Sequence, residues 1–235
     1  MKILLACDLD NTLIHSYKHR CADDICVELY EGREQSFISP RALELLKKIS
    51  AQIFFVPVTT RSIAQYRRIF WAGEFFPRCA VVANGAYFLD GNRQKNLLRE
   101  FIEPYEEKLH AQHEKFLKNP AFDICRIVDE SFLFLKCRDD LDADKIFFDT
   151  DLIVQHTGKK IYLFPPKLNK GEALKRLIKK FSPDKVFAAG DSAIDLPMLE
   201  LADVAFAAEN LRGKNFITFS AAEDFLEKIF RAACV

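Results

Sequence analysis

The chain has 235 residues, 49% hydrophobic and 29% charged, which suits one large or two small globular domains. Its 34 basic and 34 acidic residues give a net charge of zero, so no overall field favours nucleic acid or an acidic membrane. No apolar run reaches the ~20 residues of a transmembrane helix, and the scattered cysteines are unlike a disulfide scaffold. We therefore expect a cytoplasmic protein with reduced thiols that binds neither nucleic acid nor membranes.

The first apolar run, Ile3 to Cys7, is shorter than the ~7–15 apolar residues of a secretory signal. Its length is typical of a buried parallel strand, which forms a continuous apolar run of ~4–8 residues. Asp8 and Asp10 follow directly. They are therefore predicted to lie at the carboxyl end of a strand, where open α/β sheets bind their ligands.

Alternating strands and helices follow, and this order implies right-handed crossovers and a parallel sheet. Ser39-Pro40 is typical of a helix start, and Ser62 with Gln65 has the spacing of a capping box. The predicted elements are a helix from Pro40 to about Ile49, a strand over 52–58 that ends at Thr59 and Thr60, a helix from Ser62 to about Trp71, and a strand over 79–83 closed by the turn Asn84-Gly85.

Between residues 85 and 165, the alternation of single strands and helices gives way to a different order of predicted elements. Helical spacing over 104–118 precedes two apolar segments within 122–137, a second helix is predicted over 140–149, and two short strands lie within 151–164. This helix-hairpin-helix-hairpin order predicts an antiparallel sheet with helices on one face. We therefore expect 85–165 to be an inserted α+β domain that selects the substrate without supplying reacting groups.

After Pro165-Pro166 the first order returns, so 1–84 and 166–235 are expected to build one α/β core with a Rossmann-like parallel sheet. The predicted elements are a helix capped by Asn169 that runs to about Phe181, a strand over 185–190 that ends at Asp191, a short helix capped by Asp195, a strand over 204–207, and a last helix with a capping box formed by Ser220 and Glu223.

Polar groups stand at the strand ends and helix starts of this predicted sheet: Asp8 with Asp10, Thr59, Lys170, and Asp191 with Asp195. Each alone has a structural explanation, such as a turn or a helix cap, but together they fall where the ligand crevice should be. Several carboxylates in one crevice repel one another and favour a divalent cation, and Mg²⁺ suits an all-oxygen set that also receives phosphate oxygens. With a lysine and a hydroxyl, such a set can position a phosphoryl group for attack by one carboxylate while a second acts as general acid/base.

These motifs resemble those of the haloacid dehalogenase superfamily of phosphohydrolases. DLDNTL is similar to its first motif, DxDGT, and VTTRS to its second, a threonine followed by Gly-Arg. LNKGEAL resembles the third, a lysine that opens a helix, and GDSAIDLPML the fourth, GDSxxDxxM. The motif order and the insertion point also match. The insert resembles the larger α/β cap shared by sucrose-phosphate phosphatase, mannosyl-phosphoglycerate phosphatase and eukaryotic phosphomannomutase.

The resemblance implies a role for each matching residue. It makes Asp8 the nucleophile and a Mg²⁺ ligand, Asp10 the general acid/base and a ligand through its backbone carbonyl, Thr59 the phosphoryl-binding hydroxyl, Lys170 the lysine that steadies nucleophile and phosphate, Asp191 a Mg²⁺ ligand, and Asp195 a ligand directly or through water. Supporting contacts to substrate or phosphate are assigned to Thr60, Arg61, Asn84 and Asn210. The dehalogenase branch lacks the acid supplied here by Asp10, which favours phosphate chemistry.

Two positions depart from the family pattern. Asn11 replaces the glycine of the first motif, and asparagine tolerates turn conformations that most residues avoid. Thr60 replaces the glycine of the second motif and adds bulk beside the predicted phosphate site. Neither change removes a reacting atom, but both alter the expected geometry.

The segment from His15 to Phe37 is predicted to form a flap beside the nucleophile, with a hairpin that turns at Glu31-Gly32. A zinc site formed by His15, His19, Cys21 and Cys26 is the alternative interpretation, although structural zinc sites usually show tighter paired spacing.

The expected function is a Mg²⁺-dependent phosphatase that acts on a small phosphomonoester, such as a sugar phosphate, through an aspartyl-phosphate. The alternatives are a phosphosugar mutase of the same superfamily, a binding module on a retired hydrolase core, and zinc-dependent regulation through the flap. Sequence alone names neither the substrate nor the oligomeric state.

Overall fold

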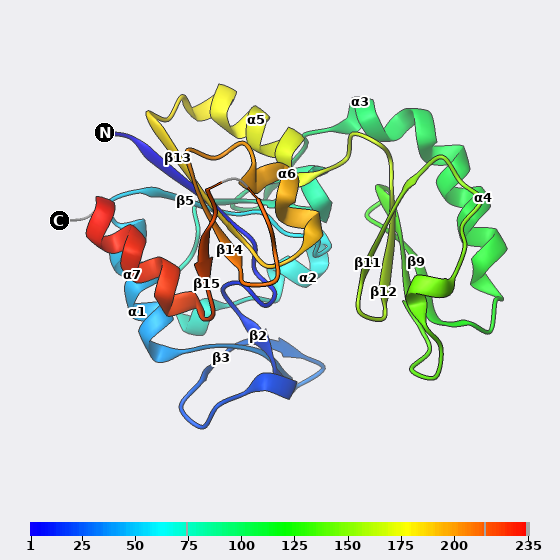
Figure 1. Cartoon of the computed structure of the whole chain (residues 1–235), viewed down its shortest axis with the longest axis horizontal. Coiled ribbons are helices and arrows are strands. Elements are labelled where there is room, and N and C mark those ends of the chain that lie inside the picture. The colour runs from blue at the N-terminus through cyan, green and yellow to red at the C-terminus, as the bar shows by residue number, and fades with distance from the viewer. Residues whose placement is uncertain (74, 214, 234–235) are drawn as a thin grey trace.

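A five-stranded sheet, parallel throughout, forms the centre of the α/β core (Figure 1). The computed structural model describes residues 1–73, 75–213 and 215–233. The sheet order is β15–β14–β13–β1–β5. Two strands come from the N-terminal segment and three from the C-terminal segment, so the prediction that both segments build one parallel sheet is confirmed. The strands are β1 (Ile3–Cys7), β5 (Phe54–Pro57), β13 (Lys185–Gly190), β14 (Val204–Ala208) and β15 (Ile217–Phe219).

Helices cover both faces of this sheet, which is why its central strand is a continuous apolar run. Leu4 and Ala6 of β1 pack into the core under one face, whereas Leu5 and Cys7 pack into the core under the other. The helices are α1 (Pro40–Ser50) and α7 (Ala222–Ala233) on one face, and α5 (Lys170–Phe181) and α6 (Leu196–Leu199) on the other.

The flap is built as predicted. Strands β3 (Ile25–Tyr30) and β4 (Arg33–Ile38) form an antiparallel hairpin beside β2 (His15–Ser16) and the 3₁₀ turn η1 (Tyr17–His19). The turn places Glu31 at φ 51° and Gly32 at φ 75°, in the left-handed region that turn residues adopt.

The helix predicted from Ser62 to Trp71 is shorter in the structure. The capping box of Ser62 and Gln65 is present, but α2 (Ile63–Arg67) ends at Arg67 and is followed by η2 (Trp71–Gly73). The chain leaves the helix to pair with the flap, because the backbone N–H of Phe70 donates to the carbonyl of Val27 at 2.9 Å. Pairing with a neighbouring strand therefore overrides the helical spacing.

A hairpin extends the core where the sequence places the start of the insert. Strand β6 (Cys79–Val82) bridges to the end of β5 and is followed by η3 (Ala83–Gly85), and β7 (Tyr87–Asp90) and β8 (Arg93–Asn96) then pair antiparallel beyond it. We therefore propose that the inserted cap begins near residue 97 rather than at 85, and ends near 165.

The cap contains an antiparallel sheet in the order β11–β12–β10–β9, with α4 on one face (Figure 1). The helix predicted over 140–149 is wrong, because only the 3₁₀ turn η5 (Ala143–Lys145) forms there, with the Asp142 side chain capping the turn. The cap elements are α3 (Arg99–Ile102), η4 (Glu103–Tyr105), α4 (Glu106–Leu117), β9 (Phe122–Val128), β10 (Phe132–Cys137), β11 (Ile153–Thr157) and β12 (Lys160–Phe164).

Alternation along these strands gives the cap sheet two different faces. Leu133, Leu135, Ile161 and Leu163 pack against α4 in the core of the cap. The opposite face contacts the α/β core and carries aromatic and cationic side chains, namely Arg126, Phe132, Phe134, Lys160, Tyr162 and Phe164.

The last helix begins differently from the prediction. Ser220 donates to the Asp224 carboxylate at 2.8 Å, whereas Glu223, the predicted capping partner, accepts a hydrogen bond from Ser39, the N-cap of α1. Among the described residues, no helix is long and apolar enough to cross a membrane.

Candidate active site

Asp8, Lys170 and Asp195 form a buried ionic triad at the carboxyl end of the central strands. Lys170 Nζ donates to Asp8 Oδ1 at 2.5 Å and to Asp195 Oδ1 at 2.6 Å, although its side chain is only 1% exposed. Burial alone would lower the pKa of Lys170, but the two carboxylates outweigh it and raise that pKa. Lys170 therefore stays charged beside Asp8 and holds the Asp8 carboxylate in place.

Local sequence explains how these groups meet. Asp8 directly follows β1, and Lys170 is the first residue of α5, whose N-cap Asn169 accepts from the backbone N–H of Glu172. Asp195 ends the 3₁₀ turn η6 (Ala193–Asp195), which follows β13 through Asp191 and Ser192.

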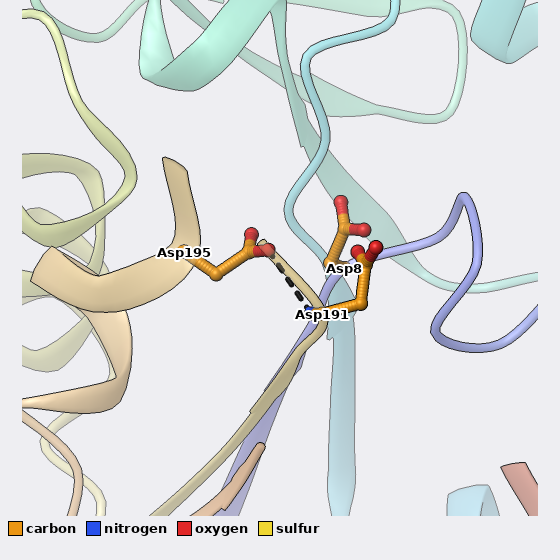
Figure 2. Close-up of side chains that lie close together, drawn as sticks. All are labelled: Asp8, Asp191 and Asp195. Carbon is orange, nitrogen blue, oxygen red and sulfur yellow. Dashed lines mark hydrogen bonds between the residues drawn. The ribbon is translucent and has the colours of Figure 1, made fainter. Parts of the chain in front are cut away.

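Asp191 completes a cluster of three carboxylates with Asp8 and Asp195 (Figure 2). One oxygen of each lies within 4.8 Å of the others, and this is the one group of three or more potential metal ligands among the described residues. Thr12 Oγ1 donates toward both Asp191 Oδ1 at 3.2 Å and Asp8 Oδ2 at 3.4 Å. Burial raises the pKa of Asp8 despite the nearby Lys170, and burial together with Asp195 raises the pKa of Asp191.

The donor set fits a hard divalent cation such as Mg²⁺, which prefers carboxylate oxygens and retains water ligands. Asp8 and Asp191 converge from adjacent strand ends, as Figure 2 shows. The oxygens of Asp195 are already engaged, because Oδ1 accepts from Lys170 and Oδ2 accepts from Ser192 and from the backbone N–H of Asp191.

Gly190 makes this packing possible. An added Cβ would lie 2.4 Å from Cβ and 2.6 Å from Cγ of Asp195, a distance that side chains do not tolerate. We expect Gly190→Ala to reduce the free energy of unfolding by about 2 kcal/mol through overpacking. Because it also displaces the carboxylate that holds Lys170, kcat should fall about 10²-fold.

Urea unfolding and steady-state kinetics measure the two effects. Gly91→Ala is the control, because Gly91 has φ 57° and nothing within 4 Å of its Cβ position. It should cost about 1 kcal/mol of backbone strain and leave kcat unchanged. A Gly190→Ala protein as stable and active as the wild type would contradict this packing account.

Asp10 belongs to a second ionic network, which ties the site to the flap. Arg61 donates to both oxygens of Asp10, at 2.8 Å from Nε and 2.7 Å from Nη2, and its Nη1 donates to Glu28 of β3 at 2.8 Å. Glu28 is fully buried and also accepts from Ser36 at 2.6 Å and Arg68 at 2.9 Å. Burial opposes ionisation of Asp10, but the Arg61 guanidinium outweighs it and lowers the pKa of Asp10.

Removal of Arg61 should therefore destabilise the fold. Arg61→Met leaves the buried Glu28 with one cationic partner, and breaking a buried pair costs about 3 kcal/mol. Arg68→Met is the matched control, because Arg68 is more exposed and Glu28 would keep Arg61, so its cost should be about 1 kcal/mol. Equal losses in urea unfolding of the two variants would contradict a central role for Arg61.

Two adjoining pockets open at this end of the sheet. The smaller has a volume of about 50 Å³ and is lined by Asp8, Asp10, Asn11, Thr60, Thr157, Lys160, Tyr162, Lys170, Asp191, Ser192 and Ile194. Asn11 lies at φ 61°, which accords with asparagine in place of the family's glycine. The cap therefore contributes side chains beside Asp8.

Of the remaining predicted site residues, some line the two pockets and others do not. Thr60 lines both pockets and Arg61 lines the larger one. Thr59, which is 1% exposed, is not among the lining residues, and its Oγ1 accepts from the backbone N–H of Arg61 at 3.1 Å. Asn84 is also buried, and its side chain donates to the Leu168 carbonyl at 3.1 Å, beside the start of α5. Asn210 is exposed and lines neither pocket.

Several residues at the site were missed by sequence reasoning. Thr12 was within the quoted first motif, four residues after Asp8, so its position was a usable signal. Glu28 gave a weaker sequence signal, because it is a lone acidic residue in an otherwise apolar strand. Lys160 and Tyr162 gave no sequence signal. The alternation of side chains along a strand shows which cap residues share a face of the sheet, but not which face contacts the core.

The alternative zinc site in the flap is not assembled in this structure. His15, His19, Cys21 and Cys26 do not bring three potential ligand atoms within 4.8 Å of one another. His15 Nε2 instead lies 2.7 Å from Asp24 Oδ2, and Cys21 and Cys26 are free thiols.

Comparisons with known proteins identify relatives of this chain. Residues 103–214 match the family model described as haloacid dehalogenase-like hydrolase, a range that contains Lys170, Asp191 and Asp195. Over this stretch, which is just under half of its length, the chain is similar to haloacid dehalogenase-like hydrolases. It is 25% identical to mannosyl-3-phosphoglycerate phosphatase of Pyrococcus furiosus, over 94% of this chain and 97% of that protein.

Solved structures of this hydrolase fold match along its whole length. The C-terminal domain of Candida albicans trehalose-6-phosphate phosphatase superposes with a TM-score of 0.67 and 17% identity, over 99% of this chain and 92% of that one. The sucrose-phosphatase of Synechocystis, solved with sucrose and phosphate, gives a TM-score of 0.64 and 15% identity, over 98% of each chain.

The family match confirms the predicted resemblance to this superfamily, and the solved structures confirm the fold, a Rossmann-like α/β core with an α+β cap. The family match also confirms that the chain is a hydrolase. The relatives named above are phosphatases, and phosphatases are phosphoric monoester hydrolases, the predicted class of hydrolase.

Proposed function

We propose that this hydrolase is a Mg²⁺-dependent phosphatase of a small phosphomonoester, such as a sugar phosphate, and that it acts through an aspartyl-phosphate at Asp8. The observation that carries this proposal is the contact of Lys170 with Asp8 in a pocket that also receives Asp10 and Asp191. Nucleophile, cation, metal-binding oxygens and acid/base thus face one small space, which phosphoryl transfer requires.

Asp8 attacks the phosphorus through a carboxylate oxygen, and the bond from phosphorus to the ester oxygen breaks. Asp10, whose pKa Arg61 lowers in the free protein, must first take up a proton from solvent as the ester binds. The ester oxygen takes that proton and leaves as an alcohol. Water then attacks the phosphorus of the aspartyl-phosphate and gives a proton to Asp10. The bond to Asp8 breaks, which releases phosphate and restores the Asp8 carboxylate.

Other residues position these groups. Lys170 offsets negative charge at Asp8, and Arg61 fixes the orientation of the Asp10 carboxylate through two hydrogen bonds. When bound, Mg²⁺ would neutralise charge on the transferring phosphoryl oxygens. Asp8 and Asp191 would hold it directly, with the Asp10 carbonyl, whereas Asp195, with its oxygens engaged, would act through water and through Lys170.

Phosphate release from a panel of phosphorylated sugars and an aryl phosphate, with Mg²⁺ present, tests the activity. We expect free phosphate and the dephosphorylated alcohol as products. An isomerised sugar phosphate with little free phosphate would instead identify a phosphosugar mutase. No turnover of any phosphate ester would contradict the proposed function and favour a binding module.

A further inference from the structure

The larger pocket beside Asp10 is placed to receive the alcohol portion of a phosphate ester. It has a volume of about 220 Å³ and shares Asp10, Thr60, Lys160 and Tyr162 with the smaller pocket. The flap, the catalytic core and the cap sheet all line it, and Phe132 and Phe134 of β10 form its apolar side. A phosphoryl group held at Asp8 would therefore direct its ester oxygen toward this space.

The charges in this pocket do not balance. Among the described residues that line it, the cations Arg61, Arg68, Arg126 and Lys160 exceed the anions Asp10 and Glu28, four against two. Arg61 and Arg68 are paired with those two acids. The side chains of Arg126 and Lys160 make no hydrogen bond or close ion pair with any described residue, although Lys160 acts electrostatically on Asp10 and Arg126 on Asp129, which lies outside the lining. They therefore supply the excess of positive charge among the lining residues.

Arg126 is oriented for an anionic ligand. Its guanidinium carbon lies 5.2 Å from the centre of the Phe134 ring, over the ring face. Stacking of this kind uses the face of the guanidinium and leaves the N–H groups at its edge free. Those donors match the two oxygens of a carboxylate in a bidentate pair.

The two unpaired cations have different positions. Lys160 lines both pockets, so it lies within reach of the phosphoryl group, whereas Arg126 lines only the larger one. If Lys160 serves the phosphoryl group, a single cation remains for the alcohol portion. One cation matches one negative charge, which favours a carboxylate over a second phosphate.

We propose that the natural substrate is a phosphomonoester whose alcohol portion carries a carboxylate, and that Arg126 binds this carboxylate. The proposal rests on the proposed phosphatase function, but it concerns specificity and not the bond-breaking steps. It assigns Arg126 of the cap as the residue that discriminates acidic from neutral esters of the same size.

Matched substrate pairs test this assignment. We would compare kcat/KM for 3-phosphoglycerate with glycerol 3-phosphate, and for 6-phosphogluconate with sorbitol 6-phosphate, because each pair differs by a carboxylate in place of a hydroxymethyl group. The acid should be preferred about 10- to 100-fold, the range of a charge-assisted hydrogen-bonded pair. A bisphosphate, fructose 1,6-bisphosphate, tests the other anion and should not exceed the carboxylates.

Variants identify the residue responsible. Arg126→Met should reduce the ratio of acid to neutral ester to about one, whereas Lys160→Met should lower kcat/KM for both members of each pair and for an aryl phosphate. Arg138→Met is the control, since Arg138 is exposed, paired with Asp140 and absent from the pocket, and it should leave the ratio unchanged.

Two results would overturn the assignment: equal turnover of acid and neutral ester by the wild type, or a preference for the acid that survives Arg126→Met. Thermal-shift titration with the same pairs measures the preference without turnover. If no ester is hydrolysed, the proposed function fails, and these titrations still decide whether Arg126 binds a carboxylate.

Discussion

Asp8→Asn is expected to lower kcat by about 10⁴-fold, equivalent to about 5 kcal/mol of barrier, while the fold survives. The amide keeps the shape of the carboxylate but lacks the charged oxygen that attacks phosphorus. Lys170 would retain Asp195 as a partner at 2.6 Å, so the buried ammonium is not left alone. Phosphate release in the presence of Mg²⁺, together with the thermal midpoint of unfolding, measures both parts of this prediction.

Asp151→Asn is the matched control for the same chemical change. Asp151 lies on the cap surface, exposed and paired with Lys108, and its replacement should leave kcat unchanged. A folded Asp8→Asn protein with near-normal phosphate release would rule out Asp8 as the nucleophile.

Removal of divalent cations is expected to abolish activity, and Mg²⁺ should restore it. Without a cation, Asp8 and Asp191 face each other at close range, and both have a raised pKa. Calcium should restore activity poorly, because its longer bonds and higher coordination number suit a different arrangement of ligands. Treatment with a chelator followed by titration of each cation in the phosphate-release assay measures this dependence.

Thermal stability provides a second readout of the same site. Mg²⁺ should raise the unfolding midpoint of the wild type, since a ligand that binds only the folded state stabilises it by mass action. Asp191→Asn should remove most of this rise, whereas Asp151→Asn should retain it. Full activity in excess chelator, or an undiminished Mg²⁺ effect in Asp191→Asn, would contradict the assigned metal site.

Sequence reasoning predicted the parts of this protein whose signals are local. The run from Ile3 to Cys7 indicated a strand buried on both faces, and helices do cover both faces of β1. The acids that follow β1 and β13 were predicted to meet, because the carboxyl ends of parallel strands share one edge of a sheet. Asp8, Lys170, Asp191 and Asp195 lie together for that reason.

Predictions failed where distant contacts decide the structure. The helical spacing after Arg67 yields to pairing between Ile69 and Glu28 of the flap. Over 140–149, Phe148 packs against Phe116 of α4 and Phe122 of β9, and only the 3₁₀ turn η5 forms instead of a helix.

The directions in which side chains point could not be predicted from the sequence either. Asn84 was assigned a supporting contact to substrate or phosphate, and no local pattern indicates that its side-chain amide donates to the Leu168 carbonyl. The pairing of Arg61 with Asp10 and Glu28 joins residues from three separate segments, and no local pattern encodes it.

Direct detection of the covalent intermediate tests the central claim. The wild-type protein would be mixed with a phosphate ester labelled on phosphorus, quenched in acid during turnover, and digested for peptide mapping. We predict label on the peptide that contains Asp8, and none in the Asp8→Asn variant treated alike. Label confined to another residue, or rapid phosphate release with no labelled protein at any quench time, would contradict an aspartyl-phosphate at Asp8.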